Sequence, residues 1–419
     1  DGIAGMTAKA EASTDDDATE RNELMKKRKV MKRSVVCLLA VLLPVMANAQ
    51  TRGYSTNFTF SQRNFADTIP IEVVDNQIFV KATAGGRVYR FCLDTGSSQG
   101  TVYASSPIRG LRALGSVVSR DAAGRSDTVS VVQLPAITIG KLTITGYVAS
   151  LFPSTMLRAY DGIIGFDFFN KGLCCKIDTR NRRMVIADRR DFFDGETGYA
   201  LHYKLKWFVP YVMVSPFKRH YDEALFDTGS NVLYTMNKQS FDEHDYKSKN
   251  VNSQVEAMVK GKLTIGNIGA ERGGEVAFLK LDRLKWDDFS FLDVSAVTTQ
   301  GSSKIGAAML RYGSVIINGF RRNIRFQPYE GGDSVKVSNK PLTTAYVPTD
   351  DGRASVGIVM PGSADYEAGL RQGDIIISID GKAIASFAAF QRFTLVKGMT
   401  HKMRVLTQEG KVKDVVITR

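Results

Sequence analysis

Two copies of the string Asp-Thr-Gly-Ser, at 94–97 and 227–230, carry the side chains of this sequence best suited to chemistry. An apolar run that predicts a β-strand stands directly before each aspartate. Carboxylates from equivalent positions of two similar units can meet at the axis between the units, and at about 3 Å they share one proton. The ionised member can deprotonate a water while the other protonates a scissile carbonyl. The strings therefore predict hydrolysis by Asp94 and Asp227, with no metal and no cofactor.

The residues that follow each aspartate are expected to support it. The glycines, having no Cβ, let the chain bring amide N–H groups to the carboxylate. The serine hydroxyls are expected to donate to the outer carboxylate oxygens, and the threonines to lock the two loops across the axis. These supporting residues are Thr95, Gly96, Ser97, Thr228, Gly229 and Ser230.

The sequence before each aspartate predicts a β-hairpin. In the first copy, alternating apolar residues flank a turn at Gly85-Gly86, and the second strand delivers Asp94. In the second copy the turn falls at Lys218-Arg219. The same supersecondary unit is therefore expected twice.

A second internal match follows, because residues 129–148 align without gaps with residues 276–295. Both segments keep the period-two alternation of strands that bury one face. The aligned apolar pairs are Leu134 with Leu281, Ile137 with Leu284, Ile139 with Trp286, Leu142 with Phe289 and Ile144 with Phe291.

Each copy ends in an apolar-Gly signal, "DGIIGFDFF" at 161–169 and the thinner "SKIGAAML" at 303–310. A basic turn and a further strand follow each signal. We expect two similar β units, named here the first lobe (68–200) and the second lobe (201–328). Long helical periodicity is absent from both.

The residue composition changes after "QPYEGGDS", where glycines and polar residues predict a linker. Beyond it the sequence predicts a compact third domain that mixes strands with a short amphipathic helix. Ser386 is the expected N-cap of that helix. A closing hairpin is expected to turn at Gln408-Glu409-Gly410.

The strings "FCLDTGSS", "ALFDTGSN" and "DGIIGFDFF" resemble the signatures of pepsin-like and retroviral-type aspartic proteases. The resemblance covers about 260 residues, and the sequence before Asp94 is most similar to the small retroviral-type unit. It implies an aspartic endopeptidase in which Asp94 and Asp227 are the catalytic pair. It also implies that Ile163–Gly165 and Ile305–Gly306 form the strand threaded behind each aspartate.

The same resemblance implies a flap hairpin near 120–127, with a counterpart near 269–275. The tyrosine of pepsin-type flaps is not found there. Both carboxylates come from one chain, so activity requires no homodimer. The implied substrates are proteins or peptides.

The C-terminal residues resemble a bacterial PDZ domain, through "PGSA" at 361–364, "AGL" at 368–370 and "GDII" at 373–376. Such a domain binds a peptide as an added strand beside a helix. The expected glycine of the carboxylate loop is missing from 340–347. The resemblances together imply a mainly β chain, with two pseudo-symmetric acid-protease β-barrel lobes and a small α+β PDZ-like domain.

The expected domain layout has six parts. They are an upstream segment and signal peptide at 1–49, an N-terminal mature segment at 50–67, the first lobe at 68–200, the second lobe at 201–328, a linker at 329–340 and the PDZ-like domain at 341–419.

The N-terminal residues predict export. A basic stretch, "KKRKVMKR", runs into an apolar run and ends at "ANAQ", which is typical of a signal peptide cleaved before Gln50. The apolar run is short for a membrane span. We expect a periplasmic or extracellular protein of the cell envelope.

The net charge and the cysteines limit the expected binding partners and disulfides. The net charge of +13 is scattered, so a solvated basic surface is the first interpretation and weak association with an anionic envelope surface the second. An exported chain is not expected to bind nucleic acid. Beyond the leader, Cys92, Cys174 and Cys175 fall in apolar strands, which favours buried thiols, and a disulfide from Cys92 to either neighbour stays open.

One competing hypothesis remains, from the class of binding proteins. The two lobes could be a catalytically degenerate scaffold that captures peptides in the cleft and at the PDZ-like domain. Both aspartates and both flanking glycines are intact, and this favours the enzyme.

Overall fold

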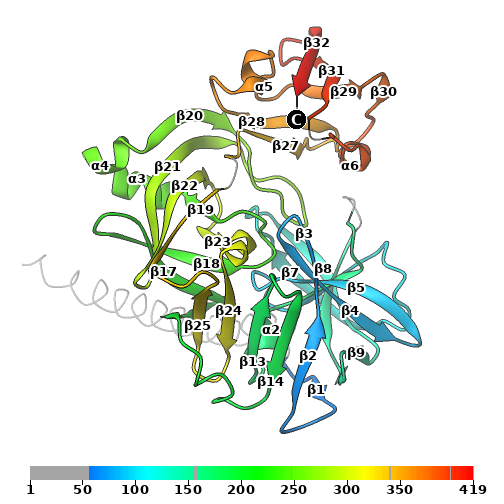
Figure 1. Ribbon diagram of the computed structural model, residues 1–419. Helices are drawn as coiled ribbons and strands as arrows, with labels where there is room; N and C mark the ends of the chain where they lie inside the picture. The colour runs from blue at the N-terminus through cyan, green and yellow to red at the C-terminus, as the bar shows by residue number, and fades with distance from the viewer. Residues whose placement is uncertain (1–55, 154–157, 247, 339–340, 397, 419) are drawn as a thin grey trace, which may run out of the picture. The chain divides into compact units, whose positions relative to one another are not determined.

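The computed structural model describes residues 56–153, 158–246, 248–338, 341–396 and 398–418. All of them fall within one compact unit, Tyr54–Arg419. The expected signal peptide lies outside the described residues. The described chain is mainly β (Figure 1), as predicted, and its longest helix has 8 residues. None of the helices in the described ranges has the length and apolar content needed to cross a membrane.

The first sheet has 11 strands and holds most of the first lobe. Its strands are β1 (Thr59–Phe60), β3 (Glu72–Val74), β4 (Gln77–Ala84), β5 (Arg87–Leu93), β6 (Gly100–Tyr103), β7 (Arg112–Arg120), β8 (Ser126–Gln133), β9 (Ile137–Ile139), β10 (Leu142–Thr145), β11 (Val148–Phe152) and β12 (Gly162–Ile164). The hairpin predicted before Asp94 is confirmed as β4 and β5. Its turn residues Gly85 and Gly86 have φ of 55° and 75°, the left-handed values that a two-residue hairpin turn needs.

The second sheet has 9 strands and belongs to the second lobe, apart from β26. Its strands are β16 (Lys204–Lys206), β17 (Val209–Phe217), β18 (His220–Asp227), β19 (Tyr234–Asn237), β20 (Val255–Gly261), β21 (Gly274–Trp286), β22 (Phe289–Thr299), β23 (Lys304–Gly306) and β26 (Ser334–Lys336). The hairpin predicted before Asp227 is confirmed as β17 and β18. β26 lies inside the predicted linker, where it pairs with β22.

The internal match between 129–148 and 276–295 is confirmed in structure. Ile139 pairs with Leu142 across one turn, and Trp286 pairs with Phe289 across the other, at aligned positions. All ten aligned apolar residues are buried. Alternation in the sequence therefore identified the core-facing side of both hairpins.

A third sheet, of 6 strands, combines strands from both predicted lobes. Its strands are β2 (Ala66–Pro70), β13 (Cys174–Asp178), β14 (Arg183–Ala187), β15 (Tyr199–His202), β24 (Gly313–Asn318) and β25 (Asn323–Pro328). The two halves join where β13 pairs antiparallel with β24. The predicted boundary between residues 200 and 201 falls inside β15.

Short helices complete the two lobes. They are α2 (Phe166–Asn170), α3 (Lys238–Asp245), α4 (Lys249–Asn252) and the 3-10 helix η1 (Ala307–Arg311). α2 and η1 begin directly after Gly165 and Gly306, the glycines of the two apolar-Gly signals. In each lobe a short strand, β12 or β23, therefore runs into a helical turn.

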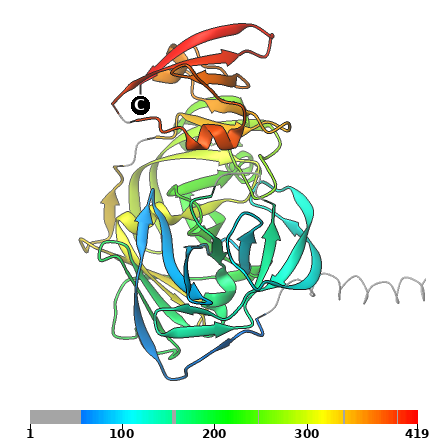
Figure 2. The same ribbon diagram turned by 90° about the vertical axis from the view of Figure 1, so that its right-hand side faces the viewer.

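The C-terminal domain, orange to red in Figure 2, is a separate sheet of 6 strands with two helices. Its elements are β27 (Thr344–Pro348), β28 (Ala354–Val359), α5 (Ala364–Glu367), β29 (Ile375–Ile379), β30 (Lys382–Ala383), α6 (Phe387–Arg392), β31 (Thr400–Leu406) and β32 (Val412–Thr418). The Ser386 side chain accepts a hydrogen bond from Ala389 N at 3.1 Å, which confirms the predicted N-cap. The closing hairpin is confirmed as β31 and β32.

The C-terminal domain packs on the second lobe beside β20. Ile358 of β28 is fully buried in an apolar cluster with Val259, Val276 and Phe278. The amide of Lys262 donates to the carbonyl of Gly357 at 3.0 Å. This contact therefore combines apolar packing with a backbone hydrogen bond.

The three cysteines of the described residues are buried free thiols. The interpretation of buried thiols is therefore confirmed, and the alternative of a Cys92 disulfide is wrong.

Candidate active site

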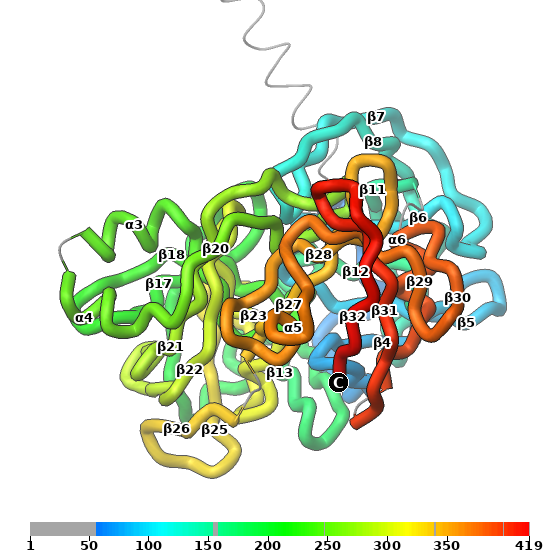
Figure 3. The backbone as a smooth tube through the Cα atoms, turned by 90° about the horizontal axis from the view of Figure 1, so that it is seen from above, coloured from blue at the N-terminus to red at the C-terminus, as the bar shows by residue number. Residues whose placement is uncertain are grey.

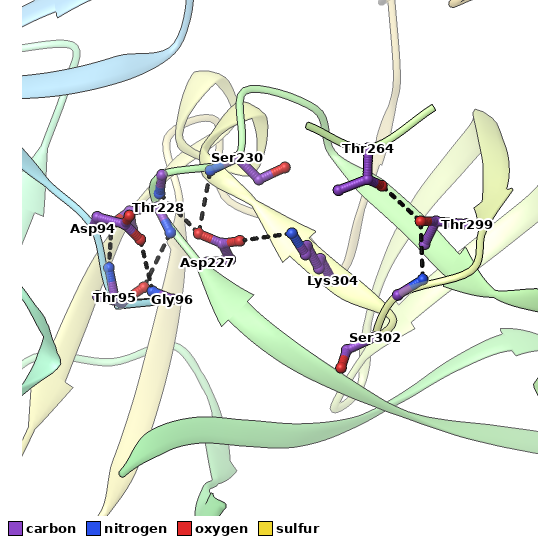
Figure 4. A network of polar contacts seen from close by, with 12 residues as sticks. Asp94, Thr95, Gly96, Asp227, Thr228, Ser230, Thr264, Thr299, Ser302 and Lys304 are labelled. Atoms are coloured by element: carbon purple, nitrogen blue, oxygen red, sulfur yellow. Dashed lines mark hydrogen bonds and ion pairs between the residues drawn. The ribbon is translucent and has the colours of Figure 1, made fainter. Parts of the chain in front are cut away.

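Asp94 follows β5 directly, and Asp227 is the last residue of β18 (Figure 4). Each of these strands pairs in parallel with a short strand that passes behind the aspartate. We name the first thread β12 with the start of α2, and the second thread β23 with the start of η1. In the first lobe Ile164 of β12 lies beside Leu93, and in the second lobe Ile305 of β23 lies beside Phe226. The threads therefore run behind the two aspartates in the same register.

The loops after the aspartates are tied to the threads by matching backbone bonds. The amide of Phe166 donates to the carbonyl of Ser97 at 2.7 Å, and the amide of Ala307 donates to the carbonyl of Ser230 at the same distance. Because amides of the threads hold both loops, the carboxyls project from a rigid backbone.

The carboxyls of Asp94 and Asp227 approach each other where the two loops meet, since each lies against the glycine of the opposite loop. Asp227 is buried, whereas Asp94 is partly exposed. Burial raises the pKa of Asp94 well above its usual range, and the charge of nearby Asp227 raises it further. Two such groups cannot both ionise easily, so the pair retains a proton near neutral pH.

Each carboxylate also accepts a backbone amide of its own loop. Gly96 N donates to Asp94 Oδ1 at 2.9 Å, and Gly229 N donates to Asp227 Oδ1 at 3.0 Å. Ser230 N lies 3.2 Å from the same oxygen of Asp227. These bonds favour the ionised form and orient both carboxyls.

The two glycines face the carboxyl of the opposite lobe. A Cβ at Gly96 would lie 2.5 Å from Asp227 Oδ1, and a Cβ at Gly229 would lie 2.5 Å from Asp94 Cγ. A Cβ atom does not come this close to a non-bonded atom. Glycine is therefore required by the approach of the two loops, and neither residue has a positive φ.

The two threonines join the loops through four hydrogen bonds. Thr95 N donates to Thr228 Oγ1 and Thr228 N donates to Thr95 Oγ1, both at 3.0 Å. The hydroxyl of Thr95 then donates to the carbonyl of Phe226 at 2.6 Å, and that of Thr228 to the carbonyl of Leu93 at 2.8 Å. Both side chains are buried, so every donor and acceptor of the lock is shielded from water.

The expectation for the first serine is wrong. The hydroxyl of Ser97 donates to the carbonyl of Gln99 at 2.8 Å and not to Asp94. A backbone acceptor two residues away competes with the carboxylate, as is common for serine in tight turns. Ser230 contributes its backbone amide to Asp227, as described above.

Lys304 is a site residue that the sequence reasoning missed. Its Nζ lies 3.4 Å from Asp227 Oδ2, and the two side chains are only 11% and 9% exposed. The signal was present in the thinner second motif, where a lysine takes a place that the first motif gives to Ile163. Ile163 is buried in an apolar cluster with Phe79 and Cys92.

Other ionisable groups near the pair are neutral at ordinary pH. Burial raises the pKa of Cys92 well above its usual value, and the charges of Asp94 and Asp227 add to the effect. Burial likewise raises the pKa of Tyr103 and of Tyr160. A thiol held neutral in this way is a poor nucleophile, so the chemistry falls to the carboxyls.

The hairpin predicted as a flap is formed by β7 and β8, and its tip contacts the second lobe. Asp121 Oδ2 accepts the amide of Ile268 at 2.8 Å, and Arg125 Nε donates to the carbonyl of Ala270. Arg125 also forms an ion pair with Asp350 of the C-terminal domain at 3.0 Å. The β7–β8 hairpin is drawn in cyan in Figure 3. The two segments predicted as flap and counterpart therefore touch each other.

Among the described residues, no group of three or more His, Cys, Asp or Glu side chains could hold a metal ion. The arrangement itself offers one acid, one base and a rigid backbone between them. It is suited to activating a water for attack on a carbonyl.

Comparison with known families identifies two regions of the chain. The sequence model of the aspartyl protease family matches residues 80–168, and that of the PDZ domain matches residues 330–408. No curated protein matches the chain. The chain therefore contains an aspartyl protease domain, which includes Asp94, and a C-terminal PDZ domain.

Proposed function

We propose that this protein is an aspartic endopeptidase whose catalytic pair is Asp94 and Asp227. One observation carries the proposal: each carboxyl lies against the glycine of the opposite loop, and Thr95 and Thr228 lock the two loops together. The family match covers only the first lobe, so the catalytic role of Asp227 rests on this geometry.

The reaction would use one proton shared between the carboxyls. The ionised carboxyl removes a proton from water, and the water oxygen bonds to the carbonyl carbon of the scissile peptide. The protonated carboxyl gives its proton to the carbonyl oxygen, which avoids a free oxyanion. The rigid loops keep acid and base at a fixed separation throughout.

The matching threads and loops support a further proposal about the fold. We infer that the two lobes are acid-protease β-barrels related by an approximate twofold axis between Asp94 and Asp227. Equal bonds from Phe166 to Ser97 and from Ala307 to Ser230 support this relation. One chain supplies both carboxyls, so the enzyme needs no second copy.

The PDZ domain would recognise a peptide segment of the substrate or of a partner. β27 lies at the edge of its sheet, where an extended peptide can be added as a further strand. The rings of Tyr346 of β27 and Phe390 of α6 contact each other at a tilted angle, with centroids 4.8 Å apart, and would give such a peptide an aromatic surface. The leader-like N-terminus supports action in the periplasm or outside the cell, and the basic charge supports weak association with an anionic envelope surface.

The direct test is mass spectrometry of a mixed peptide library incubated with the wild type, Asp94→Asn and Asp227→Asn. We expect the wild type to cleave internal peptide bonds, and each variant to lose at least about a hundredfold in rate. A pepstatin-type mimic of the tetrahedral intermediate should block the wild type.

Two results would contradict the proposal. One is cleavage that both Asn variants retain, which would place the chemistry elsewhere. The other is peptide capture that depends on the PDZ domain with no cleavage by any form, which would favour the binding scaffold.

A further inference from the structure

Lys304 gives the two aspartates unequal surroundings. It lies on β23 beside Leu225, and its ammonium group reaches Asp227 Oδ2 at 3.4 Å (Figure 4). The equivalent place in the first lobe, beside Cys92 on β5, is taken by Ile163. A cation therefore faces Asp227, and an apolar side chain stands at the matching place behind Asp94.

The burial of Lys304 makes this contact consequential. A buried ammonium group is costly unless it is paired, and within the described residues Asp227 is its one ion-pair partner. The reverse also holds, since Lys304 is the one cation of those residues within ion-pair distance of either carboxyl. With both side chains about nine-tenths buried, solvent screens the pair weakly.

The remaining titratable groups on the neighbouring strands do not offset this charge. Cys92 on β5 and Tyr103 on β6 are held neutral by burial, as is Tyr160. Arg158 is directed to Asn267, to which it donates at 3.1 Å. On the second lobe, Asp222 of β18 accepts hydrogen bonds from Tyr234 of β19 at 2.5 Å and from Ser240 at 2.6 Å.

We propose that Lys304 is a positioning residue that keeps Asp227 ionised, so that the proton shared by the pair resides on Asp94. This assignment deepens the proposed function and rests on it for its catalytic consequence. Asp227 is then the base that takes a proton from water, and Asp94 is the acid that gives its proton to the carbonyl oxygen. The positive charge also favours loss of protons from the pair as a whole, so both ionisations move to lower pH.

The test compares Lys304→Met, Lys304→Ile and Lys304→Arg with the wild type. Lys304→Ile copies the first lobe, and Lys304→Arg keeps the charge. The matched control is Lys336→Met, which removes an exposed lysine whose Nζ lies 2.9 Å from Asp293. Two readouts are needed: the pH profile of kcat/KM, and titration of aspartate carboxyl carbons by ¹³C NMR, assigned with Asp94→Asn and Asp227→Asn.

Loss of the charge should move both limbs of the pH profile, and both carboxyl titrations, upward by about one pH unit or more. Lys304→Arg and Lys336→Met should leave them near the wild-type values. In the wild type, the carboxyl that titrates at higher pH should be Asp94.

The inference is overturned if Lys304→Met and Lys304→Ile leave the titrations in place, or if Asp227 holds the proton. It is also overturned if removal of Lys304 raises the rate equally at every pH, since the lysine would then block the site. NMR titration needs no turnover, so it still decides the inference if the wild type cleaves no peptide and the proposed function fails.

Discussion

The threads behind the two aspartates pair with β5 and β18 in the same register, but they differ in polar content. In the first lobe the thread carries Ile163 before the glycine and Asp167 after it, whereas the second lobe carries Lys304 and Ala308 at those places. Asp167 is buried and accepts a hydrogen bond from the hydroxyl of Tyr147, whereas Lys304 is buried and forms an ion pair with Asp227. Each lobe thus buries one ionisable side chain on its thread, but only the second directs it at the proposed catalytic pair.

The difference shows that backbone geometry and electrostatics are separable in this fold. The glycines and threonines of the two loops make equivalent contacts, so they set the distance between the carboxyls. The side chains of the threads then set the electrostatic surroundings of each carboxyl, and with them its preference for the ionised or the protonated form. Predictions about the loops should therefore hold equally for both lobes, and predictions about the threads should not.

The largest effect is expected from adding a methyl group to either loop glycine. In Gly96→Ala or Gly229→Ala the new Cβ would lie 2.5 Å from the opposite carboxyl, which must move. We expect hydrolysis to fall by at least about a hundredfold, because misplacement of about 1 Å has that effect. Gly195→Ala, where a Cβ meets nothing within 4 Å, is the control and should keep wild-type kcat/KM.

A marked difference between Gly96→Ala and Gly229→Ala would break the equivalence of the loops. Wild-type rates in both variants would mean that the carboxyls do not approach as described.

A smaller effect is expected from the threonine lock. Thr95→Val and Thr228→Val each leave buried backbone groups without a partner, at a cost of about 1–3 kcal/mol in the free energy of unfolding. Urea denaturation should give similar losses for the two variants, and the double variant should lose less than their sum. Thr95→Ser and Thr228→Ser, which keep the hydroxyl, should lose little stability. Additive losses in the double valine variant would show that the two threonines act separately.

The smallest effect at neutral pH, and the one that distinguishes the threads, concerns Asp167. Burial raises its pKa to about 8, against the opposing hydrogen bond from Tyr147. Because this pKa lies above the unfolded value, the stabilising contribution is full below about pH 4 and is lost as pH rises through about 8.

In Asp167→Asn this loss should disappear, so the variant should gain on the wild type by roughly 1–3 kcal/mol between pH 5 and pH 9. Urea denaturation across that range is the measurement, and Asp94→Asn is the companion variant, since the raised pKa of Asp94 contributes a slope of the same sign. Parallel curves for Asp167→Asn and the wild type would show that folding does not raise the pKa of Asp167.

Much of the fold could be predicted from the sequence because its signals are local. Period-two alternation identified the hairpins before both aspartates, and the ten buried residues of the internal match. The third sheet could not be found in this way, because the pairing of β13 with β24 joins segments about 140 residues apart and leaves no local pattern.

In the candidate site, too, the features with a local sequence signal could be predicted and the others could not. Residue types alone indicated that the threonines and glycines belong at the meeting of two loops. The Ser97 hydroxyl was assigned to the wrong acceptor, because a nearby carbonyl competes with the carboxylate. Lys304 could not be predicted as a site residue from the sequence. A lysine where the motif has an apolar residue makes the match to the motif weaker, and nothing local indicates that its charge lies near Asp227.

The protonation of the pair is tested most directly by neutron diffraction from wild-type crystals held near neutral pD. We expect one deuterium between the two carboxyls, bonded to Asp94, and an ionised Asp227 facing a fully deuterated Lys304 ammonium group. A pair with no deuterium or with two, or carboxyls too far apart to hold one between them, would contradict it.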